Sequence, residues 1–205
     1  MMTNNQIADH FSLLAKLMEI HGENSFKTKS YAIASYNIDQ LQHELQDMEE
    51  HQIFSQHGIG EATGKKIIEL IKTGKLKLLD DVINKTPPGV MEMLKIKGIG
   101  PKKISTIWKE MEIENLGELL YACHENRLML YKNFGKKTQE KIIEAIEFYE
   151  SQKGNFLFAQ VEVLGQELSA YLRKIFSDET IVITGEYLRH SEIISTLEYV
   201  LPFSS

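Results

Sequence analysis

The sequence predicts a mainly α-helical protein with a small α/β segment near its carboxyl end. Apolar residues recur at helical spacing through about the first 150 residues, and a Gly-Ile-Gly turn occurs twice, 40 residues apart. A β-branched run follows at 180–184. We therefore expect tandem helical units followed by a short fragment that contains strands.

Composition is that of a globular protein. The 205 residues are 42% hydrophobic and 25% charged, which is enough to form a core. No apolar run approaches the ~20 residues of a membrane span, and no secretory signal is visible. The single cysteine, Cys123, excludes an internal disulfide and a thiolate metal cluster. We expect a cytoplasmic protein.

Charge is distributed unevenly along a chain whose net charge is −6. Residues 1–50 carry three Lys and eight acids (−5), whereas residues 51–109 carry eleven Lys and five acids (+6). Residues 154–205 have three basic and seven acidic residues (−4). Local potential decides whether an anion binds, so the central basic block predicts an anionic partner.

The first elements are predicted to be two helices. An apolar stripe over 11–20 predicts a helix that ends at Gly22, and Asn24 can cap a second helix over about 26–45. We expect the acidic residues 44–50 to be solvated. The residues expected to face inward from the second helix are Ile33, Ala34, Ile38 and Leu41.

The repeat consists of a tight turn between two helices. His57-Gly58-Ile59-Gly60 and Lys97-Gly98-Ile99-Gly100 each follow an apolar segment and precede an amphipathic helix. A weaker third copy is Asn133-Phe134-Gly135. This pattern predicts helix-hairpin-helix units.

Turn and strand signals divide the chain. Thr86-Pro87-Pro88-Gly89 is the clearest break. Beyond residue 154 a helix is predicted over 161–175, with strands at 180–184 and 197–201. We expect the chain to stop just after this last domain has begun. The predicted domains are 1–85, 86–152 and 153–205.

The Gly-Ile-Gly turns suit phosphate binding. Glycine lets the backbone amides approach a ligand, and the following helix presents unpaired N–H groups and its positive dipole end. No base edge is contacted, so we expect largely sequence-independent DNA binding. The expected contacts from the turns are Gly58, Gly60, Gly98 and Gly100, and nearby lysines are Lys65, Lys66, Lys95, Lys97, Lys102 and Lys103.

These glycines allow two other interpretations. A single Gly-Ile-Gly could simply form a helical turn, but two copies with lysines beside each favour DNA. A dinucleotide fingerprint needs a third glycine and a preceding strand, and neither copy has them.

Several long motifs, in order, resemble bacterial family X (beta-like) repair DNA polymerases. The resemblance is strong over about residues 7–150 and weak over 155–201. The motifs that carry it are Gly22–Tyr31, Lys72–Leu76, Pro87–Lys103 and Phe134–Ile142.

The resemblance implies an amino-terminal lyase domain and a second helix-hairpin-helix domain that together hold gapped or nicked DNA in base excision repair. It also implies a polymerase palm and a phosphoesterase domain beyond this chain. In that family each hairpin binds a monovalent cation, Na⁺ or K⁺, through backbone carbonyls. The matching residues are Phe54, Gln56, Ile59, Leu94, Ile96 and Ile99.

The family's Schiff-base lysine matches Lys66, and its 5′-phosphate ligands match Lys27 and Tyr31. A neutral lysine amine can attack a sugar aldehyde. The alternative is that Lys66 is a solvated residue or a phosphate contact, because the third hairpin has Lys141 at the equivalent position. This chain also has Ala62 and Ala32 where the family has basic residues.

The carboxyl end departs further from the family. Its nucleotide-site serine aligns with Glu186, and its two catalytic aspartates align with Thr196 and Glu198. Two-metal phosphoryl transfer needs clustered carboxylates, so we expect neither a Mg²⁺ site nor polymerase activity in this chain.

Two functional hypotheses therefore stay open. The chain is either a DNA-binding module with lyase chemistry at Lys66, or a non-enzymatic scaffold that tethers a partner enzyme to DNA. Both imply a protein associated with the nucleoid.

Overall fold

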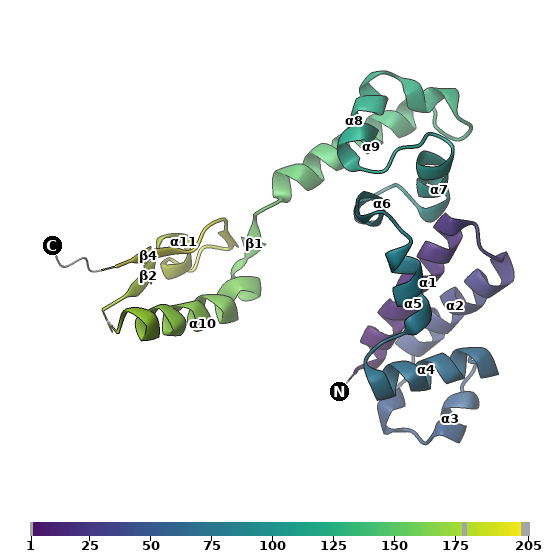
Figure 1. Ribbon diagram of the computed structural model, residues 1–205, viewed down its shortest axis with the longest axis horizontal. Helices are drawn as coiled ribbons and strands as arrows, with labels where there is room; N and C mark the ends of the chain where they lie inside the picture. The colour runs from purple at the N-terminus through teal and green to yellow at the C-terminus, as the bar shows by residue number, and fades with distance from the viewer. Residues whose placement is uncertain (1, 178–179, 202–205) are drawn as a thin grey trace. The chain divides into compact units, whose positions relative to one another are not determined.

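The computed structural model describes residues 2–177 and 180–201 and is mainly helical, as predicted (Figure 1). It divides into two compact units, residues 1–146 and 147–205. The predicted domain boundaries after residues 85 and 152 stay predictions. The helices up to the second unit are α1 (Asn4–His21), α2 (Ser25–Asp39), η1 (Leu45–Asp47), α3 (Glu50–Phe54), α4 (Glu61–Thr73), α5 (Lys77–Asn84), α6 (Pro88–Met93), α7 (Pro101–Lys109), α8 (Leu116–His124), η2 (Arg127–Leu130) and α9 (Lys136–Gln152).

Helices α1 and α2 pack against each other at the amino end. The side chain of Thr3 caps α1, and Gly22 ends it with φ +74°, a conformation that glycine adopts without strain. The predicted apolar stripe over 11–20 is confirmed, because its large side chains are buried. Burial of a Leu or Phe side chain stabilises a fold by roughly 1.5–3 kcal/mol.

Two expectations about α2 are wrong. Helix α2 ends at Asp39, not near 45, and Ile33, which was expected to face inward, is 55% exposed. In the segment that follows, the acidic side chains of Asp47, Glu49 and Glu50 are exposed, as expected, although Leu45 is fully buried. The amide of Asn4 explains this: its Nδ2 donates to the His43 carbonyl at 2.9 Å, and its Oδ1 accepts from the Leu45 N–H at 2.9 Å.

Helix α1 also packs against α7, which follows the second hairpin. Ser105 Oγ donates to the Ile20 carbonyl at 2.8 Å, and Lys109 Nζ donates to the His21 carbonyl. The His21 ring contacts Trp108 edge-on, with centroids 5.1 Å apart, and its Nε2 lies 2.8 Å from Thr86 Oγ1. These contacts tie the first helices to the second hairpin.

The second unit has a small core and short strands. Strand β1 (Phe156–Leu157) pairs antiparallel with β3 (Ile193–Ile194), and β2 (Val182–Thr184) pairs antiparallel with β4 (Glu198–Val200). The helices are α10 (Phe158–Phe176) and α11 (Gly185–Leu188). The buried cluster is Val161, Tyr187 and Ile194.

The strands predicted at 180–184 and 197–201 are present as β2 and β4. Strand β1 lies outside the predicted strand region, because two residues carry no periodic signal and their pairing partners are 38 and 36 residues away. Over the described residues, no helix is both long and apolar enough to cross a membrane.

Candidate nucleic-acid interface

Three turns in the first unit share one backbone geometry. Their first residues are Gly58, Gly98 and Asn133, with φ of +75°, +92° and +72°. This left-handed region suits glycine and is tolerated by asparagine. The third copy, the weakest in sequence, thus adopts the same turn as the other two.

The middle residue of each turn is a buried anchor. Ile59, Ile99 and Phe134 are 5%, 4% and 2% exposed. Each anchor N–H donates to the carbonyl three residues earlier, over distances of 3.1, 3.3 and 3.2 Å, and the acceptors are Gln56, Ile96 and Tyr131. The repeat predicted from the sequence is therefore a repeat of backbone hydrogen bonds.

The third residue of the two stronger turns is open to a ligand. Gly60 and Gly100 cap α4 and α7 with extended backbone, and a Cβ built on either would meet nothing within 4 Å. Helix N-termini carry unpaired N–H groups and a positive partial charge. Pro101 removes one such donor from α7. The exposed side of each turn can therefore accept an anion.

The first hairpin is fastened from two sides. Asn37 Nδ2 donates to the His57 carbonyl at 3.1 Å, and a Cβ on Gly58 would lie 1.9 Å from that nitrogen. Lys72 Nζ and Glu50 Oε1 form an ion pair at 2.5 Å that joins α4 to α3. The role of Asn37 in holding the hairpin could not be predicted from the sequence, because it depends on a contact with a residue 20 positions away.

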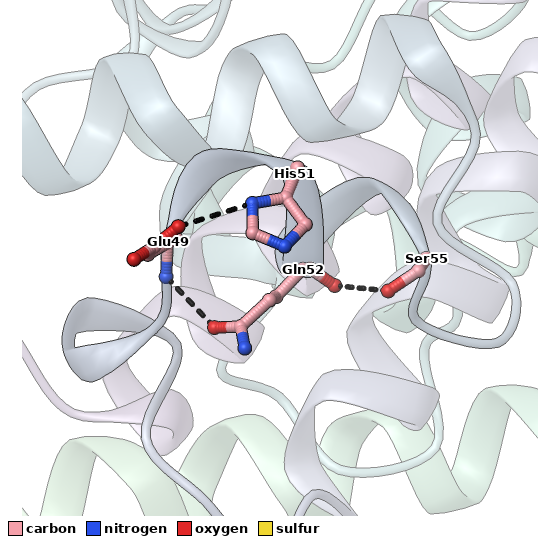
Figure 2. Close-up of polar contacts among 4 residues, drawn as sticks. All are labelled: Glu49, His51, Gln52 and Ser55. Atoms are coloured by element: carbon pink, nitrogen blue, oxygen red, sulfur yellow. Dashed lines mark hydrogen bonds and ion pairs between the residues drawn. The ribbon is translucent and has the colours of Figure 1, made fainter.

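Helix α3 is short, and polar contacts at its start and end hold it (Figure 2). The Glu49 N–H donates to Gln52 Oε1 at 3.0 Å, and Glu49 Oε2 lies 3.2 Å from His51 Nδ1. At the other end, Ser55 Oγ donates to the Gln52 carbonyl at 2.7 Å. The capping contacts satisfy backbone groups that a five-residue helix leaves unpaired.

An open cavity of about 830 Å³ lies beside the first hairpin. Five of the residues predicted from the sequence line it, although they come from α2, the first turn and α4. Those five residues are Lys27, Tyr31, Gly58, Gly60 and Lys66.

The two lysines on α4 have different surroundings. Lys66 is half-buried, and its Nζ lies 5.8 Å from the centroid of the Tyr31 ring and 3.4 Å from the Ala62 carbonyl oxygen. Lys65 is exposed and forms an ion pair with Glu61 at 2.6 Å. Lys65 is not among the residues that line the cavity, so the structure separates it from the other predicted contacts.

Phe26 was not predicted as a site residue, yet it lines the cavity and is 81% exposed. The signal that could have identified Phe26 as a site residue is its position directly after the capping residues 24–25, because a side chain in the first turn of a helix often has no apolar neighbour.

The second hairpin carries its own lysines. Lys95, Lys97 and Lys102 are exposed and Lys103 is half-buried. They flank Gly98 and Gly100, as the sequence predicted. These lysines lie on both sides of an open helix N-terminus.

The carbonyls expected to bind Na⁺ or K⁺ belong to the ends of the hairpin helices and their turns. Phe54 ends α3, and Leu94 is the C-cap of α6. Gln56 and Ile96 each accept one hydrogen bond through their carbonyl, which leaves a second lone pair for a cation. In the described parts of the chain, no cluster of three or more His, Cys, Asp or Glu side chains could hold a metal ion.

The residues aligned with the family's nucleotide site lie around α11. A Cβ on Gly185 would lie 2.5 Å from Glu198 Oε2. The Glu186 carboxylate accepts from the backbone N–H and the hydroxyl of Ser195, at 2.7 and 2.9 Å. These hydrogen bonds hold the pKa of Glu186 below its ordinary value. Glu186 is thus a negatively charged group that is already hydrogen-bonded.

Cys123 is the one thiol of the chain. It is fully buried in α8, and burial raises its pKa to about 11. The thiol is therefore protonated at neutral pH, which is the behaviour of a packing residue.

Comparison with known proteins places these elements in two described domain types. Residues 2–76 match the helix-hairpin-helix domain, and residues 90–147 match the SAM-like helix-hairpin-helix tandem. The second match contains both the second and the third turn.

One relative is similar over most of the chain. The DNA polymerase/3′-5′ exonuclease PolX of Bacillus subtilis (strain 168) is 28% identical over 188 residues, which cover 92% of this chain and 33% of PolX. The chain thus spans about a third of the length of that relative. The helix-hairpin-helix matches and this similarity confirm the resemblance of the chain to the amino-terminal part of a family X DNA polymerase.

Proposed function

We propose that the chain binds DNA through its phosphates, with the hairpins as the principal contacts and little dependence on sequence. The observation that carries this proposal is the open backbone at Gly60 and Gly100, each at a helix N-terminus with lysines beside it. A phosphate oxygen can accept hydrogen bonds there while lysine ammonium groups offset its charge. The similarity to a protein named a DNA polymerase supports the same partner.

The preferred DNA in this proposal is gapped or nicked duplex with a 5′-phosphate. The cavity beside the first hairpin supports this preference, because Lys27, Lys66 and Gly60 line one open space. A terminal phosphate carries more negative charge than an internal one, so lysines attract it more strongly. It also lies at an end of the strand, where it is accessible to the cavity. The second hairpin would bind the backbone elsewhere on the same DNA, and Na⁺ or K⁺ at the hairpin carbonyls would bridge to phosphates.

A binding comparison tests this proposal. The full chain is titrated against intact, nicked and one-nucleotide-gapped duplexes of the same sequence, the last with and without a 5′-phosphate. We expect the 5′-phosphorylated gap to bind most tightly and the intact duplex least. Equal affinity for all four would contradict the preference for ends, and no binding to any would contradict DNA as the partner.

A second candidate function is removal of a 5′-deoxyribose phosphate by Lys66. The supporting observation is its place in the cavity over Tyr31, while Lys65 is paired with Glu61. In this reaction the neutral amine adds to the C1′ aldehyde of the open sugar, and water leaves to form an iminium. Transfer of a C2′ proton to water then allows β-elimination, which breaks the C3′–O bond and leaves a 5′-phosphate on the DNA, and hydrolysis of the remaining imine releases the sugar fragment as an aldehyde and frees Lys66.

The rival hypothesis is a scaffold without enzymatic activity. Borohydride trapping on DNA with a 5′-deoxyribose phosphate separates the two, because reduction of the iminium gives a covalent adduct. Under the lyase hypothesis the chain forms an adduct that Lys66→Ala abolishes and Lys141→Ala does not. Lys141 is the matched control, since it occupies the equivalent position after the third turn. An adduct of equal yield in Lys66→Ala would contradict the assignment of Lys66.

A role in base excision repair follows from these proposals, since gaps and 5′-deoxyribose phosphates arise there. Polymerase activity is not part of the proposal for this chain. The PolX name describes the whole relative, and the residues here that align with the family's aspartates are Thr196 and Glu198.

A further inference from the structure

The third turn, Asn133–Gly135, has the same open backbone as the two stronger turns. The Gln139 N–H donates to the Gly135 carbonyl at 3.1 Å, and the corresponding hydrogen bonds to the Gly60 and Gly100 carbonyls are 2.8 and 3.0 Å long. A Cβ built on Gly135 would meet nothing within 4 Å. A ligand can therefore approach Gly135 as closely as it can approach the other two glycines.

Lysines are concentrated at this turn. Residues 132–137 contain three lysines and no acidic residue, whereas the other residues of 110–153 contain three basic and nine acidic residues. Lys132, Lys136 and Lys137 are exposed, and none of them forms an ion pair with another residue that the structure describes. The turn is thus a basic surface in an acidic stretch of chain, and local potential decides whether an anion binds.

Two of these lysines lie where a helix disfavours positive charge. Lys136 and Lys137 are the first two residues of α9, and the first turn of that 17-residue helix contains no acidic residue. Because the N-terminus of a helix carries a positive partial charge, lysines there oppose helix formation. An anion bound at the turn would offset these charges. A conflict of this kind between sequence and local stability is typical of a functional surface.

The backbone N–H groups at the start of α9 are also available. Over residues 2–177 and 180–201, the N–H groups of Lys136 and Lys137 donate to no acceptor, and Gly135 has no side chain that could cap the helix. A phosphate group offers several acceptor oxygens together with negative charge, which suits free N–H groups beside ammonium groups. We call Lys132, Gly135, Lys136 and Lys137 the third-turn surface.

We propose that the third-turn surface is a further contact for DNA phosphates, on the duplex that the first two hairpins bind. This inference rests on the proposed function, because the DNA is the same molecule. All three turns belong to one compact unit, residues 1–146, so a single DNA can contact them without any movement between units. A contact with DNA that is already held is intramolecular, and it therefore adds strongly to the affinity.

The test is the affinity of the full chain for 5′-phosphorylated gapped DNA with long duplex flanks. The double variant Lys136→Glu, Lys137→Glu should bind about tenfold more weakly, because attraction to the phosphates becomes repulsion. Its melting temperature should stay the same or rise, because acidic residues stabilise the N-terminus of a helix. A purely structural role for these lysines predicts the opposite, a fall in melting temperature.

The double variant Lys16→Glu, Lys29→Glu is the matched control, since it changes the net charge equally within the same unit. Both lysines are exposed, and neither is among the residues that line the cavity of the first hairpin. The control should bind within about twofold of the unaltered chain, because salt screens distant charges. The slope of log K against log salt should become shallower by about 0.9 for each phosphate contact that the Lys136, Lys137 variant loses.

Gly135→Leu tests the backbone separately, because it keeps every charge. Its Cβ would have no atom of the folded chain within 4 Å, so it should weaken binding several-fold at an unchanged melting temperature. The proposal is supported if both variants bind more weakly than the control and stay as stable as the unaltered chain. It is overturned if either variant binds like the control, or if the lysine variant loses affinity and melting temperature together.

These results are distinguishable from a failure of the proposed function. If the variants bind like the control while the unaltered chain binds gapped DNA, the third contact is wrong and the proposed function still holds. Failure of the unaltered chain to bind DNA would contradict the proposed function itself, and the third contact with it.

Discussion

Lys66 Nζ lies 5.8 Å from the centroid of the Tyr31 ring, and this contact joins α4 to α2 at the cavity of the first hairpin. Tyr31 is 6% exposed and packs against Phe11 with ring centroids 5.9 Å apart. A ring held by the core therefore fixes where the Lys66 ammonium lies. Cation–π contacts of this kind contribute about 0.5–1 kcal/mol at exposed sites and more when desolvated.

Replacing Tyr31 tests whether the ring positions Lys66. Tyr31→Phe keeps the ring and removes the hydroxyl, so at saturating DNA it should form the borohydride adduct in near-normal yield. Tyr31→Leu removes the ring, and its adduct yield should fall several-fold. Equal yields from the two variants, at equal DNA occupancy, would show that the ring does not position the lysine.

DNA binding should depend steeply on salt. If about four to six phosphates are neutralised by the basic block, log K falls against log salt with a slope of roughly −0.9 per phosphate, about −4 to −5 in total. Fluorescence anisotropy from low to moderate salt measures this slope. An affinity that does not change with salt would show that the lysines around the hairpins are only solvated surface.

The junction between α1 and α7 should weaken as pH falls. Burial and then the charge of Lys109 lower the pKa of His21 from its ordinary 6.5; the charge of Glu23 opposes this, and Lys85 lowers the pKa by a smaller amount. The hydroxyl proton of Thr86 is donated to the Val82 carbonyl. Thr86 Oγ1 therefore accepts the hydrogen bond from His21, whose neutral ring carries its proton on Nε2. The unfolded chain takes up this proton first, so stability is lost as pH falls from about 6.5 toward the lower native pKa.

Urea unfolding of the full chain at several values of pH between 5 and 8 measures this effect. His21→Gln keeps a donor for Thr86 and cannot titrate. The difference in unfolding free energy between the unaltered chain and His21→Gln should therefore change across this range, with the unaltered chain losing more at low pH. A constant difference would contradict a native pKa below the ordinary value.

Primer extension should be absent with either magnesium or manganese. Thr196 cannot replace a carboxylate in a two-metal site, and Glu198 alone does not hold two cations. The charge of Glu186 would repel a triphosphate. Thr196→Asp alone should not restore activity. Template-dependent incorporation that Glu198→Ala abolishes would contradict this account of the carboxyl end.

The sequence predicted local features of the fold better than distant ones. The hairpins were predictable because neighbouring residues determine both a glycine turn and the apolar face of a helix. The docking of Leu45 was not, because it depends on Asn4, 41 residues earlier. The gathering of Lys27 and Lys66 in one cavity was expected only from the family resemblance, since the two belong to different helices whose packing no local pattern specifies.

The central claim is that the open backbone at the hairpins binds DNA, and paired glycine substitutions test it most directly. A Cβ added at Gly60 or Gly100 would have no atom of the folded chain within 4 Å. The double variant Gly60→Leu, Gly100→Leu should therefore have a nearly unchanged melting temperature. The side chains would instead occupy the space that a phosphate needs. Gly117→Leu, at an exposed glycine in α8 away from the turns, is the matched control.

The measurement is the dissociation constant for 5′-phosphorylated gapped DNA at one fixed salt concentration. We predict that the double variant binds at least about tenfold more weakly, a loss of about 1.4 kcal/mol, while Gly117→Leu binds like the unaltered chain. A double variant that is folded and binds with unchanged affinity would contradict the claim.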